Sequence, residues 1–337
     1  MAKRVTLADL AEQTGLNIST ISRALSRPDR VSTETRRLVE KVASQLGYAT
    51  NIAARNLSRG TSDTILVLAP SFEGQAISPV FTQILLGVCE EAKSLGLNVM
   101  LQQCLGQTVS ASDVIRHLQT GVADSVLLVA VENWLPPTDG HAGETILPVV
   151  SIFRDLTASG LTSVMTQEAD GYVAIVDHLV ARGHRQFAFV SGPEGMHHEQ
   201  VRYNAVRHRL SQLGLDRKLV RLEGGPFDMP SGQKAAESFL ALKNRPSAVI
   251  CCSDALALGF MHAILDSGLR VPDDVAIAGF DGMDYTAFTT PSLTTVIQPT
   301  LEIGRVAVQV LTDLHNGRIT TPRLVALAPS FVIRQST

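Results

Sequence analysis

The sequence predicts a small all-α head followed by a larger α/β body. Residues 1–60 contain short helical stretches around one glycine, and from Thr64 onward short β-rich runs alternate with amphipathic helical stretches. Charge divides the chain in the same way. Residues 1–60 hold ten Lys and Arg against five Asp and Glu, a net charge of +5, so a total of −3 leaves −8 for the remainder. A basic head on an acidic body is typical of a nucleic-acid reader attached to another domain.

Composition excludes several classes of protein. A length of 337 residues predicts two or three compact units, and no run approaches the roughly 18 to 20 apolar residues of a membrane span. The start "MAKRVTLADL" lacks the apolar region of a signal peptide. Cys251 and Cys252 are adjacent and Cys89 lies in a helical pattern, so neither a disulfide framework nor a zinc site is indicated. We expect a cytoplasmic, reduced protein with no metal, no cofactor and no membrane association.

The first helix of the head is predicted over "LADLAEQT". Thr6 can cap it, and Leu7, Leu10 and Ala11 follow at helical spacing. Gly15 then supplies the positive φ of a tight turn. This pattern predicts one short amphipathic helix that ends at a sharp corner.

The second helix is predicted over "ISTISRAL", after the capping residue Asn17. Ile21 and Leu25 face inward at a four-residue step, so the outer side consists of Ile18, Ser19, Ser22 and Arg23. Two short helices around a glycine turn form a helix-turn-helix, whose second helix normally enters the DNA major groove. Hydroxyl and guanidinium groups on that face are donors for phosphates and base edges. The alternative is a plain helical hairpin with a solvated face.

A third helix is predicted over "TETRRLVEKVASQL". Ser32 can cap it, Val31 can pack against its first turn, and Gly47 ends it. The expected inner stripe consists of Leu38, Val42 and Leu46. Three helices then complete a small head.

Residues 51–58 are helix-prone but shorter than the roughly 12 to 15 residues that an isolated helix needs in water. The stretches "VTLADLAEQTGLNISTISRAL", "VSTETRRLVEKVASQLGY" and "NIAARNLSRGTS" resemble the DNA-binding head and hinge of the lactose-repressor/galactose-repressor (LacI/GalR) family of bacterial transcription regulators. The resemblance continues through the body to "TPSLTTVIQPTLEIGRVAVQVL" and "APSFVIRQST". It therefore covers essentially the whole chain.

The resemblance implies which residues contact DNA. It places Leu57 as a wedge between central base pairs, where such wedges kink the duplex and widen the minor groove. Thr50 stands where the family usually has a proline, so the start of the hinge helix is less restrained than in relatives. The implied DNA-binding residues are Thr6, Ile18, Ser19, Thr20, Ser22, Arg23, Asn51, Ala54 and Leu57.

The body contains eight apolar runs typical of buried parallel strands. They are "TILVLAP", "LNVMLQQ", "DSVLLVAV", "LPVVSIF", "QFAFVSG", "LVRLEGG", "SAVICC" and "DVAIAGFD". Eight strands are many for one sheet, and the resemblance resolves them into two doubly wound parallel-sheet lobes like those of periplasmic sugar-binding proteins. The implied domains are a helix-turn-helix (1–48), a hinge helix and linker (49–62), and an effector-binding and dimerisation domain (63–337). Its N-lobe is 63–162 plus 293–325, and its C-lobe is 163–292 plus 326–337.

Ligands of such sheets bind at the carboxyl ends of strands, here in the cleft between the lobes. Asp281 and Arg202 match family positions that bind an effector. The alternatives are that Asp281 only caps a turn and that Arg202 is an ordinary solvated residue of a helix. Ser253 occupies a common contact position, but Ser253 or Asp254 could simply cap the next helix. Phe227 matches an aromatic that stacks on ligands, or is a packed loop residue. The candidate set is Ser71, Phe81, Phe153, Arg154, Arg202, Phe227, Ser253 and Asp281, with Val80 in the second place of an aromatic pair at Phe81.

Phe153 departs from the family pattern. Many relatives have an aspartate there, so either the effector has fewer hydroxyls at that point or Arg154 reaches in to meet an anionic group. His197 and His198 lie near the same cleft in sequence. A metal site is one interpretation, but adjacent histidines rarely share a ligand geometry, and loop histidines are the default.

The leading hypothesis is a dimeric, sequence-specific transcription regulator, most simply a repressor. It binds pseudo-palindromic double-stranded operator DNA under the control of a small hydroxylated effector such as a sugar or sugar derivative. The alternative within the class is a non-sugar effector such as a nucleobase. An α/β enzyme is disfavoured because the sequence contains no G-x-G-x-x-G, G-x-x-x-x-G-K-[ST] or G-x-S-x-G motif.

Overall fold

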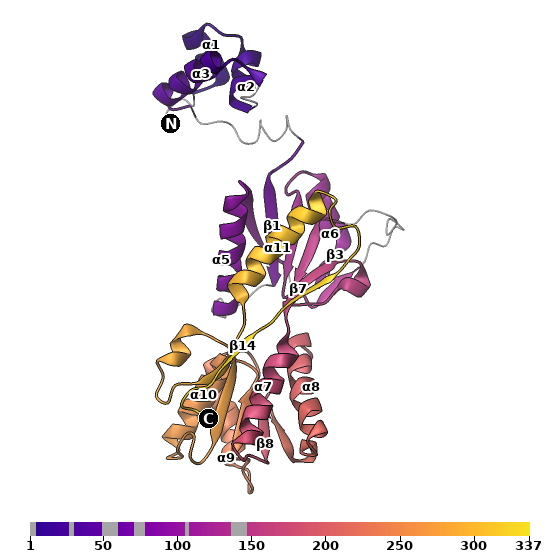
Figure 1. The fold of residues 1–337 in the computed structure, drawn as a ribbon, viewed down its shortest axis with the longest axis vertical. Coiled ribbons are helices and arrows are strands. Elements are labelled where there is room, and N and C mark those ends of the chain that lie inside the picture. The colour runs from indigo at the N-terminus through magenta and orange to yellow at the C-terminus, as the bar shows by residue number, and fades with distance from the viewer. Residues whose placement is uncertain (1–4, 27–29, 49–59, 71–77, 105–107, 136–146) are drawn as a thin grey trace. The chain divides into compact units, whose positions relative to one another are not determined.

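The computed structural model describes residues 5–26, 30–48, 60–70, 78–104, 108–135 and 147–337. The chain divides into two compact units, residues 1–63 and 64–337. Figure 1 shows the helical head at the N-terminus and the α/β body that follows it. The expected hinge at 49–62 lies almost wholly outside the described residues.

The described part of the head contains three helices, α1 (Leu7–Thr14), α2 (Ile18–Ser26) and α3 (Thr33–Leu46). Their caps form where the sequence predicts them. Thr6 and Asp9 make a reciprocal capping box on α1, and Ser32 accepts from the backbone N–H of Thr35. Gly15 and Gly47 end α1 and α3 with φ values of 70° and 65°, a left-handed conformation that favours glycine.

The core of the head corrects one prediction. The buried residues are Leu10, Ile21, Ala24, Val39 and Ala43. Leu38, expected in the inner stripe of α3, is 41% exposed. The stripe that packs inward is Val39, Val42, Ala43 and Leu46, one residue out of phase with Leu38.

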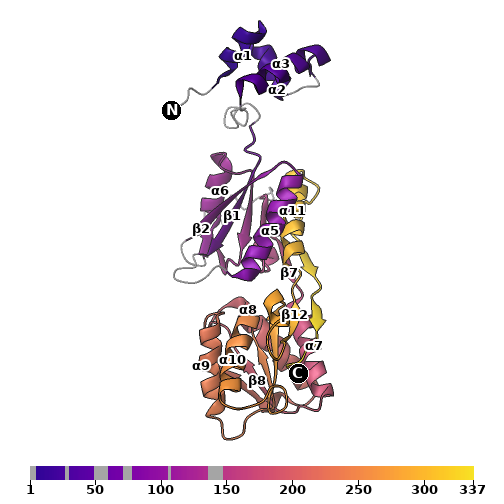
Figure 2. The same cartoon turned by 90° about the vertical axis from the view of Figure 1, so that its left-hand side faces the viewer.

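The body consists of two six-stranded sheets covered by helices on their faces (Figure 2). The N-lobe sheet has the order β13-β7-β6-β4-β1-β2, and all of its pairs are parallel. Its strands are β1 (Thr64–Pro70), β2 (Asn98–Cys104), β4 (Ser125–Val129), β6 (Val149–Ile152), β7 (Thr162–Thr166) and β13 (Leu324–Leu327). Its helices are α5 (Pro79–Ser94), α6 (Ala111–Gln119) and α11 (Thr300–His315), and β3 (Thr108–Ser110) pairs with β5 (Asn133–Leu135) beside it.

The C-lobe sheet has the order β14-β12-β11-β10-β8-β9. Only the β12–β14 pair is antiparallel among its described pairs. Its strands are β8 (Phe187–Val190), β9 (Leu219–Leu222), β10 (Ala248–Cys251), β11 (Ala276–Asp281), β12 (Thr294–Ile297) and β14 (Ser330–Val332). Its helices are α7 (Glu168–Ala181), α8 (His197–Gln212), α9 (Met229–Leu240) and α10 (Asp254–Asp266). The described residues of the body also form short 3₁₀ turns at Thr157–Ser159, Asp216–Lys218 and Asp284–Ala287.

All eight apolar runs form strands of these sheets, which confirms the predicted fold class. The chain passes between the lobes three times, after β7, after β12 and after β13. Strand β7 extends to Thr166 in the N-lobe sheet, and β12 begins at Thr294 in the C-lobe sheet. Each change of sheet therefore falls a few residues beyond the lobe boundaries expected at 162, 292 and 325.

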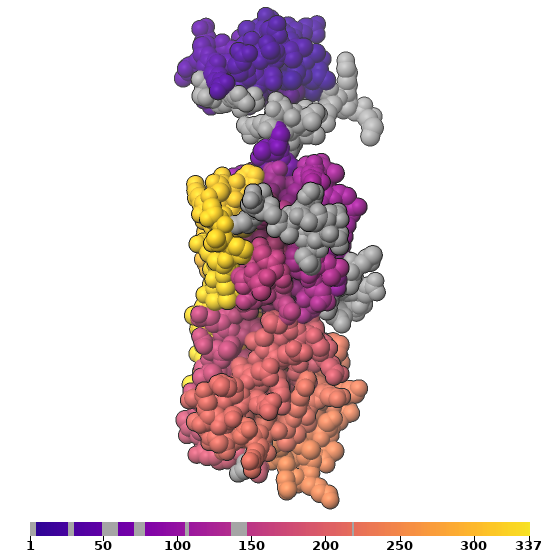
Figure 3. Space-filling view, turned by 90° about the vertical axis from the view of Figure 1, so that its right-hand side faces the viewer, coloured from indigo at the N-terminus to yellow at the C-terminus, as the bar shows by residue number. Residues whose placement is uncertain are grey.

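The last N-lobe helix, α11, packs tightly on α5. A Cβ at Gly87 would lie 2.0 Å from the carbonyl oxygen of Leu301, and one at Gly304 would lie 2.2 Å from that of Ile84. Only glycine permits this backbone approach. The close crossing fixes the C-terminal part of the chain along one side of the N-lobe, where it appears yellow in Figure 3.

Candidate functional sites

The outer face of α2 carries polar side chains without apolar cover. Ser19, Ser22 and Arg23 are exposed, Thr20 is half-buried, and Ile18 is 47% exposed. Asn17 begins the helix, since its Oδ1 accepts from the backbone N–H of Ser19 at 3.0 Å. The face therefore presents hydroxyl groups and one guanidinium group on a helix-turn-helix. Such groups donate hydrogen bonds to phosphates and to the edges of guanine bases. Thr6, the candidate before the turn, is exposed and caps α1. The remaining DNA-binding candidates, Asn51, Ala54 and Leu57, lie outside the described residues.

A cavity of about 160 Å³ lies where the two lobes meet. Its walls come from the carboxyl ends of β1, β4, β6 and β11, from the first turns of α5 and α8, and from loops of the C-lobe. This is the location that the topology of parallel sheets predicts for a ligand. The lining residues are Pro70, Ser78, Val80, Phe81, Val129, Ala130, Phe153, Met196, His198, Arg202, Phe227, Ser253, Asp281 and Gln298.

Arg202 is buried in the first turns of α8 and all of its nitrogens are engaged. Nη2 and Nε donate to Oε1 of Glu168 at 2.5 and 3.1 Å, and Nη1 donates to the carbonyl of Cys252 at 2.7 Å. Its guanidinium also lies 4.6 Å from the ring centroid of Phe280. The arginine is thus held in one orientation by a carboxylate, a carbonyl and an aromatic face.

Glu168 begins α7 and is the centre of this network. Its carboxylate also lies 3.2 Å from Nδ1 of His198. Burial by itself raises the pKa of Glu168, but Arg202 and His198 outweigh burial and lower that pKa to about 2. Glu168 is therefore ionised throughout the physiological range.

Asp281 ends β11 with a φ of 130°, a strained conformation for a residue other than glycine. Its Oδ1 accepts from Nε2 of Gln298 at 2.9 Å and lies 3.9 Å from Nη1 of Arg202. Burial raises the pKa of Asp281 to about 7, against the opposing effect of Arg202. Asp254 holds the following turn, because its Oδ2 accepts from the backbone N–H groups of Gly282 and Met283, both at 2.8 Å.

Three phenylalanines supply the aromatic surfaces of the cavity. Phe81 and Phe153 belong to the N-lobe, and Phe227, which is 36% exposed, belongs to the loop before α9. Phe153 adopts a φ of 71° after β6, and its ring packs edge-on against His198 at 5.4 Å between centroids. The wall where the family resemblance led us to expect an aspartate is therefore a buried aromatic ring.

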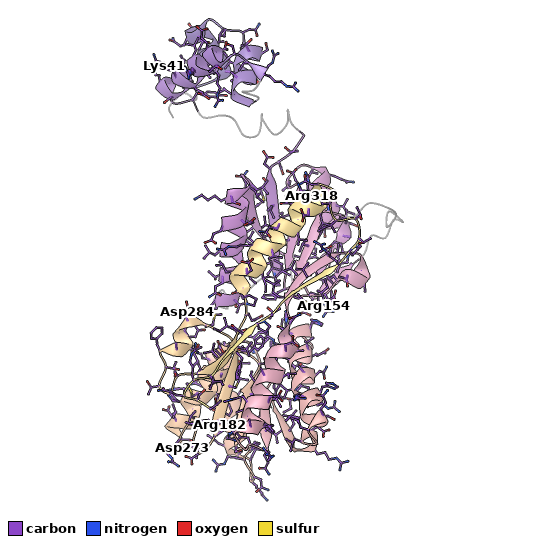
Figure 4. All side chains as sticks on the ribbon, in the orientation of Figure 1. Lys41, Arg154, Arg182, Asp273, Asp284 and Arg318 are labelled. Carbon is purple, nitrogen blue, oxygen red and sulfur yellow. The ribbon has the colours of Figure 1, made fainter. Side chains whose placement is uncertain are left out.

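Arg154 is placed beside Glu132 rather than in the lining of this cavity. Its Nη1 lies 3.8 Å from Oε2 of Glu132, which also accepts from the backbone N–H of His197 at 3.1 Å. Glu132 belongs to the N-lobe and His197 begins α8 of the C-lobe, so this carboxylate joins the lobes. Figure 4 labels Arg154 at the level where the lobes meet.

The structure brings together six of the eight cleft candidates: Phe81, Phe153, Arg202, Phe227, Ser253 and Asp281. Ser253 also caps α10 by accepting from the backbone N–H of Leu256, so both alternatives hold for it. Ser71 lies outside the described residues. The sequence interpretation missed Glu168 and Gln298, because nothing near them in sequence marks their partners.

His197 and His198 are not loop residues, since they form the first turn of α8. No group of three or more His, Cys, Asp or Glu with the arrangement of a metal site occurs among the described residues. The four cysteines are free thiols. In the part of the chain that the structure covers, no helix combines the length and apolar character that crossing a membrane requires.

A helix-turn-helix head joined to a two-lobed body with a cleft defines a ligand-responsive class of DNA-binding transcription regulator. Comparisons with known proteins agree with this class. Residues 6–51 match the "Bacterial regulatory proteins, lacI family" and residues 176–337 match the "Periplasmic binding protein-like domain". The chain is 32% identical over 334 residues to the HTH-type transcriptional repressor CytR of Escherichia coli (strain K12), covering 98% of this chain and 96% of the relative. The chain belongs to the LacI family of transcription regulators.

Solved structures show the same architecture. The lac repressor dimer bound to operator and the anti-inducer ONPF matches with a TM-score of 0.84 at 27% identity, over 99% of each chain. The transcriptional regulator CelR in complex with cellobiose matches with a TM-score of 0.68 at 25% identity, over 99% of this chain and 100% of that one. These relatives are regulators rather than enzymes.

Proposed function

We propose that this regulator is a homodimeric repressor whose operator affinity is set by a small molecule in the cavity between the lobes. The observation that supports it most directly is the pairing, in one chain, of an exposed polar face on α2 with a cavity that both lobes line. An effector changes DNA affinity only if it binds one arrangement of the lobes better than the other. A cavity built from both lobes meets that condition, because its shape depends on how they close.

The proposed effector is a hydroxylated small molecule with one flat apolar face. Asp281, Gln298 and Ser253 offer hydrogen-bonding groups on one side, while Phe81, Phe153 and Phe227 offer aromatic faces. The small volume favours a compact ligand, such as a sugar, a sugar derivative or a nucleobase, over a drug-sized one. The complexes of the lac repressor and of CelR with sugar-type ligands support this choice.

The proposed dimer forms through exposed apolar residues of the body. Leu86 of α5 is 51% exposed, and Leu101 of the neighbouring strand β2 is 46% exposed. Leu101 shares a face of the sheet with Val99, which packs on the α5 side. Contiguous apolar residues on a surface typically mark an interaction site. The dimeric lac repressor supports the assignment, and two copies of α2 then read two half-sites.

We further propose that DNA contacts come from α2 and from the hinge, with Leu57 as the wedge. The proposed division is a DNA-binding head to residue 48, a hinge at 49–62 and the effector and dimerisation domain from 63. Since bacterial operators lie in the cytoplasm, the protein acts there.

Arg23→Ala tests the DNA-binding role. A guanidinium paired to a guanine edge gives roughly 1 to 3 kcal/mol of discrimination, so the variant should lose specific binding while keeping most of its bulk-DNA binding. The measurement is a gel-shift and footprinting series with a selected operator and with random DNA. Arg37→Ala, on the exposed surface of α3, is the matched control. Equal losses on both DNAs would make Arg23 a phosphate contact, and a footprint over one unpaired half-site would contradict the dimer.

A further inference from the structure

The positive groups nearest the cavity are already opposed by the protein's own carboxylates. Arg202 lines the cavity, yet Glu168 accepts two of its hydrogen bonds and is itself buried. The same carboxylate lies 3.2 Å from His198, the other basic residue of the lining. Both basic side chains of the lining are therefore engaged by one buried carboxylate.

On the N-lobe side of the cavity, basic groups are also opposed by the protein's own carboxylates. Arg154, the second arginine at the junction, lies 3.8 Å from Glu132. That carboxylate also accepts the N–H of His197, so it occupies the positive end of α8. At α10, the first turn contains Asp254, whose carboxylate is buried against the turn that follows Asp281. An anionic ligand thus meets no open helix terminus at these two helices.

Two further residues of the lining carry oxygen atoms that can accept hydrogen bonds from a ligand. Asp281 lines the cavity, and Oε1 of Gln298 is buried with no hydrogen-bond partner among the described residues. A buried amide oxygen without a partner is costly, so a ligand that donates to it gains affinity. Acceptors of this kind favour hydroxyl or amino groups and oppose carboxylates and phosphates.

We propose that the cavity is selective for an uncharged, hydrogen-bond-donating effector, and that Glu168 sets this selectivity by withholding Arg202 from anions. The inference rests on the proposed effector function and specifies the charge class of the ligand. The sequence left two interpretations of Phe153 open: an effector with fewer hydroxyls at that point, or an anionic group that meets Arg154. The proposal favours the first, because it requires a neutral ligand.

The test compares ligands that differ only in an anionic group. The probes are D-galactose with D-galacturonate, D-ribose with D-ribose 5-phosphate, and uridine with uridine 5′-monophosphate, together with inorganic phosphate. Thermal shifts of the full chain report binding by mass action. In the wild-type protein, neutral members should raise the melting temperature and anionic members should not. A wild-type protein stabilised by an anionic member as much as by its neutral partner would overturn the proposal.

Glu168→Gln then removes the negative charge opposite Arg202 while keeping the shape and one hydrogen-bond acceptor. Its apparent affinity for anionic probes should rise roughly tenfold or more, the range of a charge-assisted hydrogen bond. Glu199→Gln is the matched control, because Glu199 is buried on the same helix as Arg202 but pairs with Arg221 at 2.8 Å, outside the cavity lining. It should gain no anion binding.

A folded Glu168→Gln protein that gains nothing for anions would also overturn the proposal. If that variant does not fold, Glu132→Gln, which frees the terminus of α8 and Arg154, should give a smaller gain in the same direction, and no gain would count against the charge argument. If no probe stabilises the wild-type protein while Glu168→Gln gains anion binding, the proposed effector class is wrong and the role of Glu168 stands.

Discussion

The two lobes contribute opposite chemistry to one cavity. Of the described lining residues, six of seven from the N-lobe are apolar, with Ser78 as the exception, whereas five of seven from the C-lobe are polar. The polar groups need fixed orientations, and the C-lobe supplies them through a buried network centred on Glu168. Apolar walls need no such partners, because their contribution scales with the area that they bury. In the proposed function, the C-lobe is therefore the recognising side, and the N-lobe is the side that covers the ligand.

A substitution at Arg202 tests the contrast between the lobes most directly. Arg202→Ala leaves the buried carboxylate of Glu168 without its main partner, which typically costs 3 to about 5 kcal/mol in the free energy of unfolding. Urea denaturation should show this loss, together with the disappearance of any effector-induced thermal shift.

Arg209→Ala is the control on the same helix. Arg209 pairs with Asp177 at 2.7 Å, but both side chains are partly exposed, so the loss should stay below about 1 kcal/mol. Similar losses for the two variants would mean that the network around Glu168 does not stabilise the C-lobe more than an ordinary surface pair does.

The second prediction concerns pH. Because burial raises the pKa of Asp281 to about 7, the folded protein holds this proton more tightly than the unfolded chain does. The resulting stability is fully present below pH about 4 and is lost as pH rises through about 7, with a slope of at most about 1.4 kcal/mol per pH unit. Glu168 behaves in the opposite way, since its pKa is lowered to about 2: its contribution is present above the unfolded pKa and is lost as pH falls through about 2.

Asp281→Asn should flatten the decline in unfolding free energy between pH 5 and pH 8. The groups that act on Asp281 are Arg202, Asp254, Gln298 and Glu168, and all of them remain in this variant. Asp284→Asn, on the exposed turn labelled in Figure 4, is the control and should keep the wild-type slope. An unchanged slope in Asp281→Asn would show that Asp281 is ionised in the folded protein at neutral pH.

The difference between the lobes also explains which features the sequence could predict. Caps and turns depend on neighbours within a few residues, so Thr6, Gly15, Ser32 and Gly47 were all predicted correctly. The prediction that Leu38 faces inward was wrong because α3 contains two apolar stripes one residue apart. Which stripe is buried depends on packing against the other helices of the head.

The cavity shows the same division between local and distant information. Strand ends placed Asp281 at the cleft, because parallel strands finish at one edge. Glu168 was missed because its partner Arg202 is 34 residues away, and no periodicity links them. The strands β7, β12, β13 and β14 were missed because they are short and several are rich in Thr and Ser. Long-range pairing of polar residues is thus what sequence patterns alone did not predict.

The third prediction changes the covering wall. Phe153→Asp places a carboxylate on the N-lobe side, where the family resemblance led us to expect one, and aspartate tolerates the φ of 71° better than phenylalanine does. Preference should shift by about tenfold toward the more hydroxylated member of pairs such as D-galactose with D-fucose or D-ribose with 2-deoxy-D-ribose. Phe153→Leu is the control, because it removes the ring without adding a charge. A lower melting temperature with an unchanged preference would mean that Phe153 only packs.

The smallest expected effect is that of Arg154→Ala. This variant tests whether the N-lobe contributes an ionic contact between Arg154 and a ligand. The pair with Glu132 is 3.8 Å long and the arginine side chain is 29% exposed, so solvent screens most of its energy. The unfolding free energy should therefore change by less than about 1 kcal/mol, and the ranking of neutral over anionic ligands should not change. Isothermal titration with a neutral ligand and its anionic counterpart measures both points. If Arg154→Ala abolishes the binding of an anion that the wild-type protein accepts, then Arg154 leaves Glu132 to meet ligands. In that event the N-lobe recognises charge as well as covering the cavity, and the contrast between the lobes no longer holds.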